Sequence, residues 1–246
     1  MSANELHTLA LLARAPTPGR SKTRLIPALG ADGACEFAKA ALTDLLHLMV
    51  AIPSCRRILF YTPAESKADL QSLLNEEGLD SSWQLERQSD TPDLGGRLSG
   101  ALELIQQTRQ SADSSTTPRP AVTFMGMDCF DLTPEKVQNS MHVVSQSSGK
   151  AHMHPALDGG YVVLTVPLQC NANTIFSEIA WSTNQTGEMQ MRRLETAGLT
   201  CDLGEKLPDV DEPVDLETLW ERHSSISDFP STMRYLRSIM PDLLKK

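Results

Sequence analysis

Basic residues are scarce in this 246-residue chain, which has 22 Lys and Arg against 31 Asp and Glu and a formal net charge of -9. Nucleic acids and anionic membranes attract broad basic surfaces, so this balance disfavours both as partners. No apolar run approaches the ~20 residues that cross a bilayer, and the amino-terminal residues lack the pattern of a secretory signal. We therefore expect a cytoplasmic protein that binds neither membranes nor nucleic acids.

Cysteine is also rare. The five cysteines are odd in number and widely spaced, which argues against a disulfide framework or a zinc knuckle. Cys129 has no basic neighbour in the sequence, so we interpret it as a small buried residue rather than a nucleophile. His152 and His154 alternate on a predicted strand without further nearby histidines or cysteines, which indicates a structural role. No G-x-S-x-G motif is present.

The positive charge that is present gathers in one loop. Residues 13–25 read A-R-A-P-T-P-G-R-S-K-T-R-L and contain no acidic residue. Two prolines and a glycine prevent a helix there. We expect this loop to present backbone N–H groups, guanidinium forks and an ammonium group to phosphates from exposed positions, at Arg14, Gly19, Arg20, Lys22 and Arg24. The alternative is a solvated basic turn, but the loop's position after a first apolar strand favours phosphate binding.

Strands and helices are predicted to alternate along the chain. The strands are residues 6–13, 57–61, 83–87, 121–125, 150–154, 161–166 and 199–203. The helices are residues 31–50, 64–75, 94–107, 133–145, 184–197, 214–222 and 231–244, and residues 110–120 form a surface loop. This order predicts one three-layer α/β/α domain over residues 1–246 with a mostly parallel sheet, a core over about residues 6–220 and a helical tail over 221–246. Strands 6–12 and 121–125 should be central, because they are uninterrupted apolar runs.

Carboxylates follow the ends of two predicted segments. Asp128 comes just after strand 121–125, where it can bind Mg²⁺ or Mn²⁺, and Asp211 in D-V-D-E-P-V-D-L can supply a second carboxylate. Two nearby carboxylates raise each other's pKa unless a cation lies between them, so Asp128→Asn is expected to leave the protein no less stable. We interpret Asp131 as a helix cap, and Asp215 as a residue in the first turn of a helix.

A turn with the sequence A-L-D-G-G-Y has two interpretations that the sequence leaves open. Paired glycines let the backbone approach a ligand, and Asp158 can accept hydrogen bonds from sugar hydroxyls. The same D-G-G sequence is ordinary hairpin-turn chemistry.

Six segments, taken in order, resemble the DUF2064 family of the glycosyltransferase-A superfamily: A-R-A-P-T-P-G-R-S-K-T-R-L, D-L-G-G-R-L, G-M-D-C-F-D-L, P-A-L-D-G-G-Y, W-S-T and D-V-D-E-P-V-D-L. The resemblance spans about residues 6–220 and implies the nucleotide-diphospho-sugar transferase fold and glycosyltransferase activity. The first loop also resembles that of 2-phospholactate guanylyltransferase, a nucleotidyltransferase on the same fold.

The resemblance also implies roles for individual residues. Lys22 and Arg24 would contact phosphate and act in catalysis with Asp128, while Asp128 and Asp211 would bind Mg²⁺ or Mn²⁺. The remaining implied contacts are Asp93 and Arg97 with the nucleotide, Asp158, Gly159 and Gly160 with the acceptor or sugar, and Trp181 with a base or sugar. The chain departs from the family pattern where Arg14 replaces a common lysine, Phe130 a common proline and His154 a common glycine.

Three functional hypotheses follow. In the first, an acceptor attacks the anomeric carbon of a nucleotide sugar. In the second, a substrate phosphate attacks a nucleoside triphosphate and releases pyrophosphate, a chemistry that suits a dense cationic loop. In the third, the protein binds nucleotides without catalysing a reaction. The observation behind this hypothesis is the departure from the family pattern at Phe130 and His154. The sequence leaves open the base, the sugar, the small-molecule acceptor and whether the chain forms a homo-oligomer.

Overall fold

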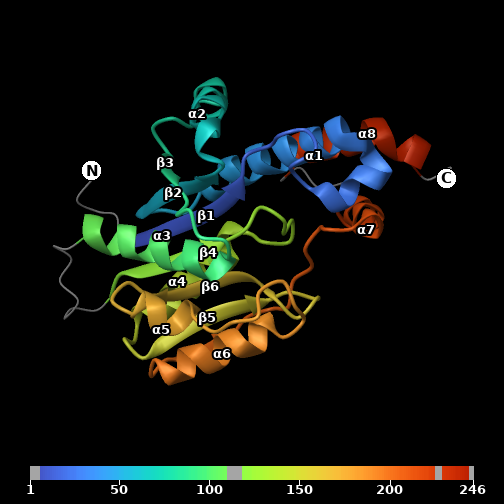
Figure 1. The fold of residues 1–246 in the computed structure, drawn as a ribbon. Coiled ribbons are helices and arrows are strands. Elements are labelled where there is room, and N and C mark those ends of the chain that lie inside the picture. Colours follow the sequence, from blue (N-terminus) through green and yellow to red (C-terminus); the bar gives the residue numbers. More distant parts are fainter. Residues whose placement is uncertain (1–5, 110–117, 225–228, 244–246) are drawn as a thin grey trace.

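Seven strands form one mixed sheet in the computed structural model, which describes residues 6–109, 118–224 and 229–243 (Figure 1). The order across the sheet is β3-β2-β1-β4-β6-β5-β7. The strands are β1 (His7–Arg14), β2 (Cys55–Thr62), β3 (Gln84–Arg87), β4 (Ala121–Met125), β5 (Lys150–Pro155), β6 (Tyr161–Pro167) and β7 (Thr200–Leu203). Among these strands, β6 alone runs antiparallel to its neighbours. The predicted strands and the mostly parallel sheet are confirmed, whereas most of the predicted loop 110–120 lies outside the described residues.

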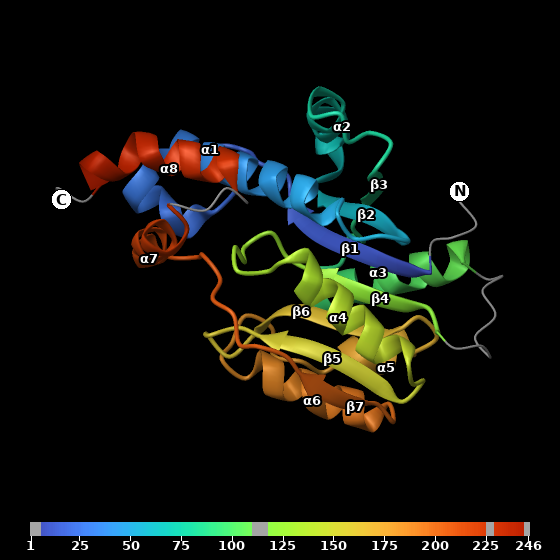
Figure 2. The ribbon, with the colours of Figure 1, turned by 180° about the vertical axis from the view of Figure 1, so that it is seen from behind.

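Helices cover both faces of the sheet (Figures 1 and 2). Helices α3, α5 and α6 lie on one face, and α1 and α4 on the other. The bounds are α1 (Ile26–Met49), α2 (Lys67–Glu76), α3 (Leu94–Thr108), α4 (Pro134–Ser145), α5 (Ala172–Phe176), α6 (Thr186–Thr196), α7 (Pro213–His223) and α8 (Pro230–Leu243), with short 3₁₀ helices at Thr23–Leu25 and Ala64–Ser66. The three-layer α/β/α architecture is therefore confirmed. Within the described part of the chain, no helix is long and apolar enough to cross a membrane.

Strand β1 is central, as its continuous apolar sequence predicts. Leu9 and Leu11 belong to the core cluster under α1, and Ala10 belongs to the cluster under α3. Alternate residues of one strand thus fill two cores, which is why β1 has no polar face. Strand β1 pairs in parallel with both β2 and β4, so the carboxyl ends of β1 and β4 adjoin. The loops that follow these two ends form the site described below.

Two helix starts follow the capping rules. Asp93 accepts a hydrogen bond from Gly96 N at 2.8 Å at the start of α3, and Thr133 accepts one from Lys136 N at 3.4 Å at the start of α4. The start of α1 differs from the prediction of residue 31. The segment from Ile26 to Met49 is interrupted at Gly30, whose φ of 74° and ψ of 170° are not helical. The expected helix is therefore the part that follows this interruption.

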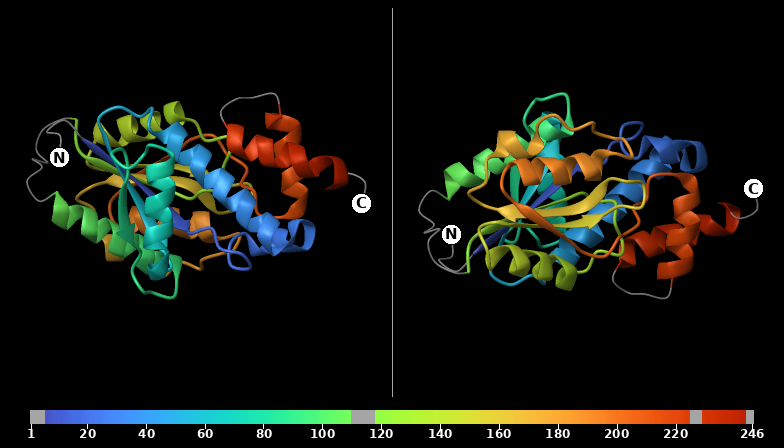
Figure 3. Two further views of the ribbon diagram at one scale, coloured as in Figure 1. Left: turned by 90° about the horizontal axis from the view of Figure 1, so that it is seen from above. Right: turned by 90° about the horizontal axis from the view of Figure 1, so that it is seen from below.

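The last helix packs alongside α1 at one end of the molecule (Figure 3). Met233, Leu236 and Met240 of α8 are buried in the cluster that contains the apolar face of α1. Asp44 of α1 is 2% exposed and accepts hydrogen bonds from the backbone N–H groups of Ser231 and Thr232, at 2.9 and 2.7 Å. A side chain of α1 thus caps the start of α8 across nearly two hundred residues of sequence.

Candidate functional site

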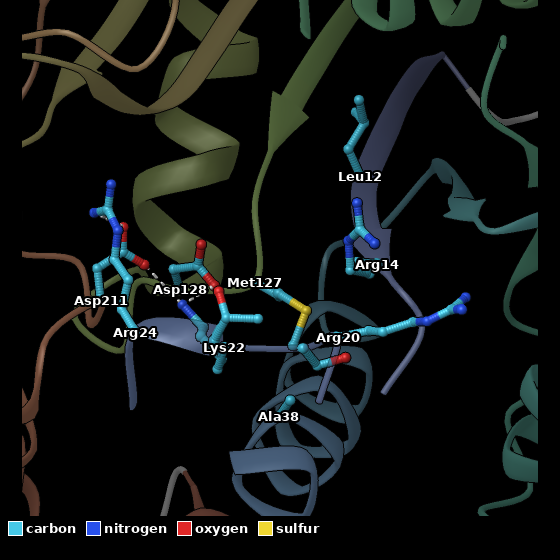
Figure 4. A pocket seen from close by; sticks show the side chains of 11 residues that line it. Leu12, Arg14, Arg20, Lys22, Arg24, Ala38, Met127, Asp128 and Asp211 are labelled. Carbon is cyan, nitrogen blue, oxygen red and sulfur yellow. Dashed lines mark hydrogen bonds and ion pairs between the residues drawn. The ribbon is translucent and has the colours of Figure 1, made fainter. Parts of the chain in front are cut away.

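A pocket of about 310 Å³ opens where the loops after β1 and β4 meet (Figure 4). The first loop contributes Arg14, Arg20, Lys22 and Arg24 to its lining, and Asp128 and Asp211 come from the loops after β4 and before α7. The structure therefore brings together the basic loop and the two carboxylates that sequence analysis selected from distant segments. This position is the expected one, because ligands of open α/β sheets bind outside the carboxyl ends of the strands.

Internal hydrogen bonds hold the first loop in a compact turn. Thr17 N donates to Ser21 Oγ at 2.9 Å, and Ser21 Oγ donates to Ala15 O at 3.0 Å. Gly19 has a φ of 72°, a conformation that favours glycine, and Lys22 takes the same left-handed region with φ 45° and ψ 48°. A non-glycine residue adopts this region when its surroundings hold it there. The contacts of the Lys22 side chain supply that constraint.

The Lys22 ammonium lies among three oxygens. Figure 4 shows two of the three residues that supply them, Asp128 and Asp211. Its Nζ is 2.6 Å from Asp128 Oδ1, 3.0 Å from Asp211 Oδ1 and 2.6 Å from the carbonyl oxygen of Val210. Burial lowers the pKa of Lys22, but the charges of Asp128 and Asp211 outweigh burial and raise the pKa above its ordinary value. Lys22 is therefore a buried cation whose charge is balanced by two carboxylates.

This arrangement corrects one expectation from the sequence. Lys22 was expected to be exposed, yet its side chain is 10% exposed. The reason is electrostatic, since two carboxylates that converge on one point need a positive charge between them. Arg24 is on the surface as predicted, with a side chain 62% exposed and Nη1 3.5 Å from Asp211 Oδ2.

Backbone hydrogen bonds position the two carboxylates. Asp128 follows β4, and its carbonyl oxygen accepts a hydrogen bond from Val210 N at 2.9 Å. The carboxylate of Asp215 accepts hydrogen bonds from the backbone N–H groups of Asp211 and Glu212, at 2.9 and 2.7 Å. Asp215 and Glu212 form a capping box at the start of α7, so the predicted place of Asp215 in the first turn is confirmed. The start of α7 thereby determines where Asp211 lies.

The other basic side chains of the loop remain accessible. Arg14 and Arg20 are exposed and lie on the opposite side of the pocket from Lys22 (Figure 4). Arg20 makes a long ion pair of 4.0 Å with Glu65, both side chains being well exposed. Such a pair contributes little to stability, so the guanidinium group can turn to a bound anion.

The two carboxylates fit a divalent cation. Asp128 Oδ1 is buried and makes no hydrogen bond with good geometry to any described residue, although it lies next to the Lys22 ammonium. Asp128 and Asp211 contact the same nitrogen atom, so their oxygens are close enough to ligate one ion. Across the described residues, no cluster of three or more His, Cys, Asp or Glu side chains forms a metal site. Magnesium is commonly held by one or two carboxylates together with substrate phosphates, which matches this pair.

A second, acidic pocket of about 430 Å³ adjoins the pocket around Lys22 on the α7 side. It is lined in part by Asp158, Asp209, Asp211 and Arg24. Burial, together with the negative charge of Asp158 first and then of Asp211 and Asp128, raises the pKa of Asp209 to about 6. The role of Asp209 is not visible in the sequence, because its burial and the approach of Asp158 depend on tertiary structure. The one indication in the sequence is that Asp209 is the first aspartate of the D-V-D segment, two residues before Asp211.

Three other residues that were predicted to contact a ligand, Asp93, Arg97 and Trp181, do not line the pocket around Lys22. Asp93 and Trp181 line a separate pocket of about 590 Å³ next to the start of α3, while Arg97 donates from Nε to Thr91 O at 3.3 Å. Asp93 keeps its capping role as well. A nucleotide that spans both pockets would bring these residues into one site, and their contacts with a ligand stay predictions.

The D-G-G turn has a packing role. Gly159 has a φ of 94°, and a Cβ there would lie 2.2 Å from the carbonyl oxygen of Asn184. Gly160 N donates to Asp158 Oδ1 at 2.8 Å, which closes the turn between β5 and β6. The turn therefore connects two antiparallel strands, as the hairpin interpretation predicts. Contact of these glycines with a sugar or acceptor stays a prediction.

Phe130 and His154, the two departures from the family pattern that change the size of the side chain, are both buried. Phe130 is 4% exposed and packs against Phe37 and Phe229 in tilted and edge-to-face contacts, at ring centroid distances of 5.9 and 5.1 Å. His154 is also 4% exposed and its Nδ1 lies 3.0 Å from Glu205 O. Neither residue lines the pocket around Lys22. These two changes therefore give less support to the hypothesis that the protein binds nucleotides without catalysis.

Single residues near the site take structural roles. Cys129 is buried, and burial raises the pKa of its thiol to about 12, as expected for an inert cysteine. Burial, followed by the charge of nearby His154, lowers the pKa of His152. Asp131 does not cap α4, contrary to our interpretation. It pairs instead with Arg222 at 2.6 Å and His223 at 3.4 Å, since Thr133 already occupies the cap position.

Solved structures with a similar arrangement of strands and helices show which type of fold this chain has. A solved structure from Desulfovibrio desulfuricans G20, described as a "putative nucleotide-diphospho-sugar transferase", matches with a TM-score of 0.82 and 22% sequence identity over 97% of both chains. A 4-diphosphocytidyl-2C-methyl-D-erythritol synthase matches with a TM-score of 0.54 and 9% identity over 86% of this chain and 96% of the other. The synthase of that name from Anaerococcus prevotii DSM 20548 gives 0.50 and 10% over 94% and 96%. The chain thus has the nucleotide-diphospho-sugar transferase type of fold.

The family is defined by sequence. Residues 45–183 match the family described as "Uncharacterized protein conserved in bacteria (DUF2064)", and the chain belongs to it. This match covers Asp128, the D-G-G turn and Trp181, whereas the first loop and Asp211 lie outside the matched residues. A comparison with curated proteins gives no match.

Proposed function

We propose that the protein is a transferase that takes a nucleotide-activated donor, and that the donor is a nucleotide-diphospho-sugar. The observation that carries this proposal is the convergence of the basic loop with Asp128 and Asp211 at the carboxyl ends of β1 and β4. A diphosphate needs cationic groups on the phosphate side and carboxylates that can hold a metal ion, and this pocket offers both.

The residues of the pocket divide the work of binding. The exposed guanidinium groups of Arg14, Arg20 and Arg24 would bind the donor's diphosphate, because they are close to the pocket and free of strong pairing. Asp128 and Asp211 would hold Mg²⁺ or Mn²⁺, which supplies positive charge to the leaving diphosphate when bound. Lys22 would add its own charge on the same side of the donor.

The acidic pocket beside the centre favours glycosyl transfer. Asp158, Asp209 and Asp211 give this pocket a negative potential, and the charges of Asp158 and Asp211 add to the effect of burial in raising the pKa of Asp209 to about 6. A phosphorylated second substrate would be repelled by this potential, while a neutral acceptor with a hydroxyl group would not. A carboxylate can also accept hydrogen bonds from such a hydroxyl. We therefore place a neutral acceptor at this pocket.

Nucleotidyl transfer is the second candidate, and the basic loop is the observation that favours it. Arg14, Arg20, Lys22 and Arg24 lie within eleven residues, a density that suits a triphosphate better than a diphosphate. The products separate the two reactions, since glycosyl transfer releases a nucleoside diphosphate and nucleotidyl transfer releases pyrophosphate.

A two-stage experiment tests the proposal. Nucleotide sugars and nucleoside triphosphates are first screened for a rise in melting temperature with and without Mg²⁺ or Mn²⁺, because a ligand of the folded state stabilises it. Stabilising donors are then incubated with hydroxylic and phosphorylated acceptors while nucleoside diphosphate and pyrophosphate are assayed. We expect metal-dependent stabilisation by a nucleotide sugar and release of its nucleoside diphosphate. Pyrophosphate release would favour the second candidate, and the absence of stabilisation by either donor class would refute both.

Arg24 provides the matched variant for this screen. Arg24→Ala should weaken donor binding by about 1.5 to 3 kcal/mol, the range for a hydrogen bond to a charged group, without lowering the melting temperature of the free protein. Arg237→Ala, on the distant helix α8, removes the same charge and should bind the donor as wild type does. Equal donor affinity in Arg24→Ala and wild type would mean that the loop is a solvated turn.

A further inference from the structure

The oxygens around Lys22 resemble the ligands of a hard metal ion. Two carboxylate oxygens, from Asp128 and Asp211, and the backbone carbonyl of Val210 lie within 3.0 Å of the ammonium nitrogen. Carboxylate and carbonyl oxygens are the ligands that magnesium and related cations prefer. These oxygens come from two loops that the fold holds together through the hydrogen bond between Val210 N and Asp128 O. The chain thus builds a site for a cation and fills it with its own ammonium group.

The backbone of the first loop directs Lys22 into this position. Lys22 has left-handed φ and ψ, and its carbonyl oxygen accepts a hydrogen bond from Leu25 N at 2.9 Å as the 3₁₀ helix begins. The preceding turn is closed by the hydrogen bonds that Arg20 N and Ser21 N donate to Thr17 O. A loop held at both sides of Lys22 keeps the side chain pointed at the carboxylates.

Arg24 differs from Lys22 in the same loop. Its guanidinium group is 62% exposed and approaches Asp211 Oδ2 and Glu212 Oε1 at 3.5 and 3.7 Å. A compact ammonium group fits between the two carboxylates, whereas the broad guanidinium fork stays on the surface. Two positive charges of one loop are therefore placed differently, one inside the oxygen site and one beside it.

We propose that Lys22 competes with the divalent cation for Asp128 and Asp211, so that metal binds well only after an anionic ligand has drawn Lys22 out of the oxygen site. This inference rests on the proposed function for the choice of Mg²⁺ or Mn²⁺ and adds an order of binding to it. Because coupling between two ligands is reciprocal, metal and donor phosphates then strengthen each other's binding through Lys22. The lysine acts as a place-holder that prevents the two carboxylates from repelling each other before the ligands arrive.

Titration with Mn²⁺ alone, without nucleotide, tests the competition. Calorimetry or the electron paramagnetic resonance signal of free Mn²⁺ gives the dissociation constant at fixed ionic strength. Lys22→Met should bind Mn²⁺ at least tenfold more tightly than wild type, and Lys22→Met combined with Asp128→Asn should lose that gain. Arg24→Met is the matched control, because it removes one positive charge beside Asp211 and should change the constant less than threefold.

Lys22→Gln is a second variant, which is needed if Lys22→Met fails to fold. Its amide can still donate hydrogen bonds to the oxygens, and it should also bind Mn²⁺ more tightly than wild type does. An unchanged or weaker Mn²⁺ affinity in a folded Lys22 variant would overturn the proposal.

Chemical labelling of the wild-type protein provides a test that needs no variant. Lys22 is shielded by its oxygen contacts, whereas Lys39 is exposed. A lysine-acylating reagent should therefore label Lys22 slowly, and Mn²⁺ should speed its labelling relative to Lys39, as measured by peptide mass spectrometry. An unchanged ratio at saturating Mn²⁺ would refute the competition. Neither test includes a donor, so both outcomes are independent of whether the protein transfers a sugar.

Discussion

Asp128 and Lys22 illustrate how one contact changes the expected result of a substitution. The sequence suggested that Asp128→Asn would relieve repulsion between carboxylates and leave the protein no less stable. In the structure the Lys22 ammonium already separates the carboxylates, at 2.6 Å from Asp128 Oδ1. Removing the charge of Asp128 therefore leaves a buried ammonium with less compensation.

We predict that Asp128→Asn lowers the free energy of unfolding by about 1 to 3 kcal/mol, measured with urea in the absence of metal. The lower half of the range is expected because the Asp128 side chain is 38% exposed. Asp158→Asn is the control, since Asp158 is exposed. The amide oxygen of the new side chain can still accept the hydrogen bond from Gly160 N. A rise in stability for Asp128→Asn would restore the expectation from the sequence.

His7 gives a prediction about pH. Burial, then the charges of Arg109 and His142, lowers the pKa of His7 from 6.5 to about 4. The unfolded chain therefore binds the proton more tightly between these values, so the stability that neutral His7 contributes is complete above pH 6.5 and is lost as pH falls toward 4. His7→Gln should flatten the loss of stability in this window, measured as urea midpoints at several pH values. An acid-side slope equal to that of wild type would contradict the assignment to His7.

At the scale of elements, the turn between β5 and β6 is expected to be sensitive to its first glycine. A methyl group at Gly159 would strike Asn184 O, and the φ of 94° is strained for any other residue. We predict that Gly159→Ala costs about 1 to 3 kcal/mol in urea unfolding. Gly160→Ala should cost less, because the nearest atom is 3.1 Å away on the side chain of Asp158. Equal effects would mean that the contact with Asn184 does not limit the turn.

The strands were predicted well and the helix boundaries less well, for physical reasons. Strands such as β1 and β4 are buried on both faces, so their sequences are continuous apolar runs. Helix α5 was missed because its five residues are too few to display a helical period. The interrupted start of α1 depends on the left-handed conformation of Gly30, which the sequence permits but does not require.

The members of the candidate site and the approach of Asp128 to Asp211 were predicted from the sequence, but the contact of Lys22 with both carboxylates was not. Lys22, Asp128 and Asp211 each stand out by charge type and position after a predicted strand or before a helix. Their meeting depends on pairing between β1 and β4 and on the path of the chain into α7. Local sequence carries no distance information across such separations, which is why the burial of Lys22 and the raised pKa of Asp209 were missed.

At the scale of the whole molecule, Asp44 joins α8 to the body of the protein. Asp44→Ala removes both hydrogen bonds to the first turn of α8 and should cost about 1 to 2 kcal/mol, as the loss of a helix cap does. Faster hydrogen exchange in α8 than in α1 is the expected signature. Asp32→Ala, at an exposed position of the same helix α1, is the control and should leave exchange unchanged. Uniform acceleration in both helices would mean that α8 does not loosen separately.

The pairing of early with late segments has a consequence for synthesis on the ribosome. When α3 has emerged, β1, β2 and β3 can already associate, yet the edge of β1 that receives β4 still has unpaired backbone groups. The side of α1 that α8 covers stays exposed even longer, until residues near Met240 have been made. For most of its translation, a nascent chain of this protein should therefore expose both an unpaired strand edge and an apolar helix face that chaperones can bind. It should stop binding chaperones only when α8 docks on α1.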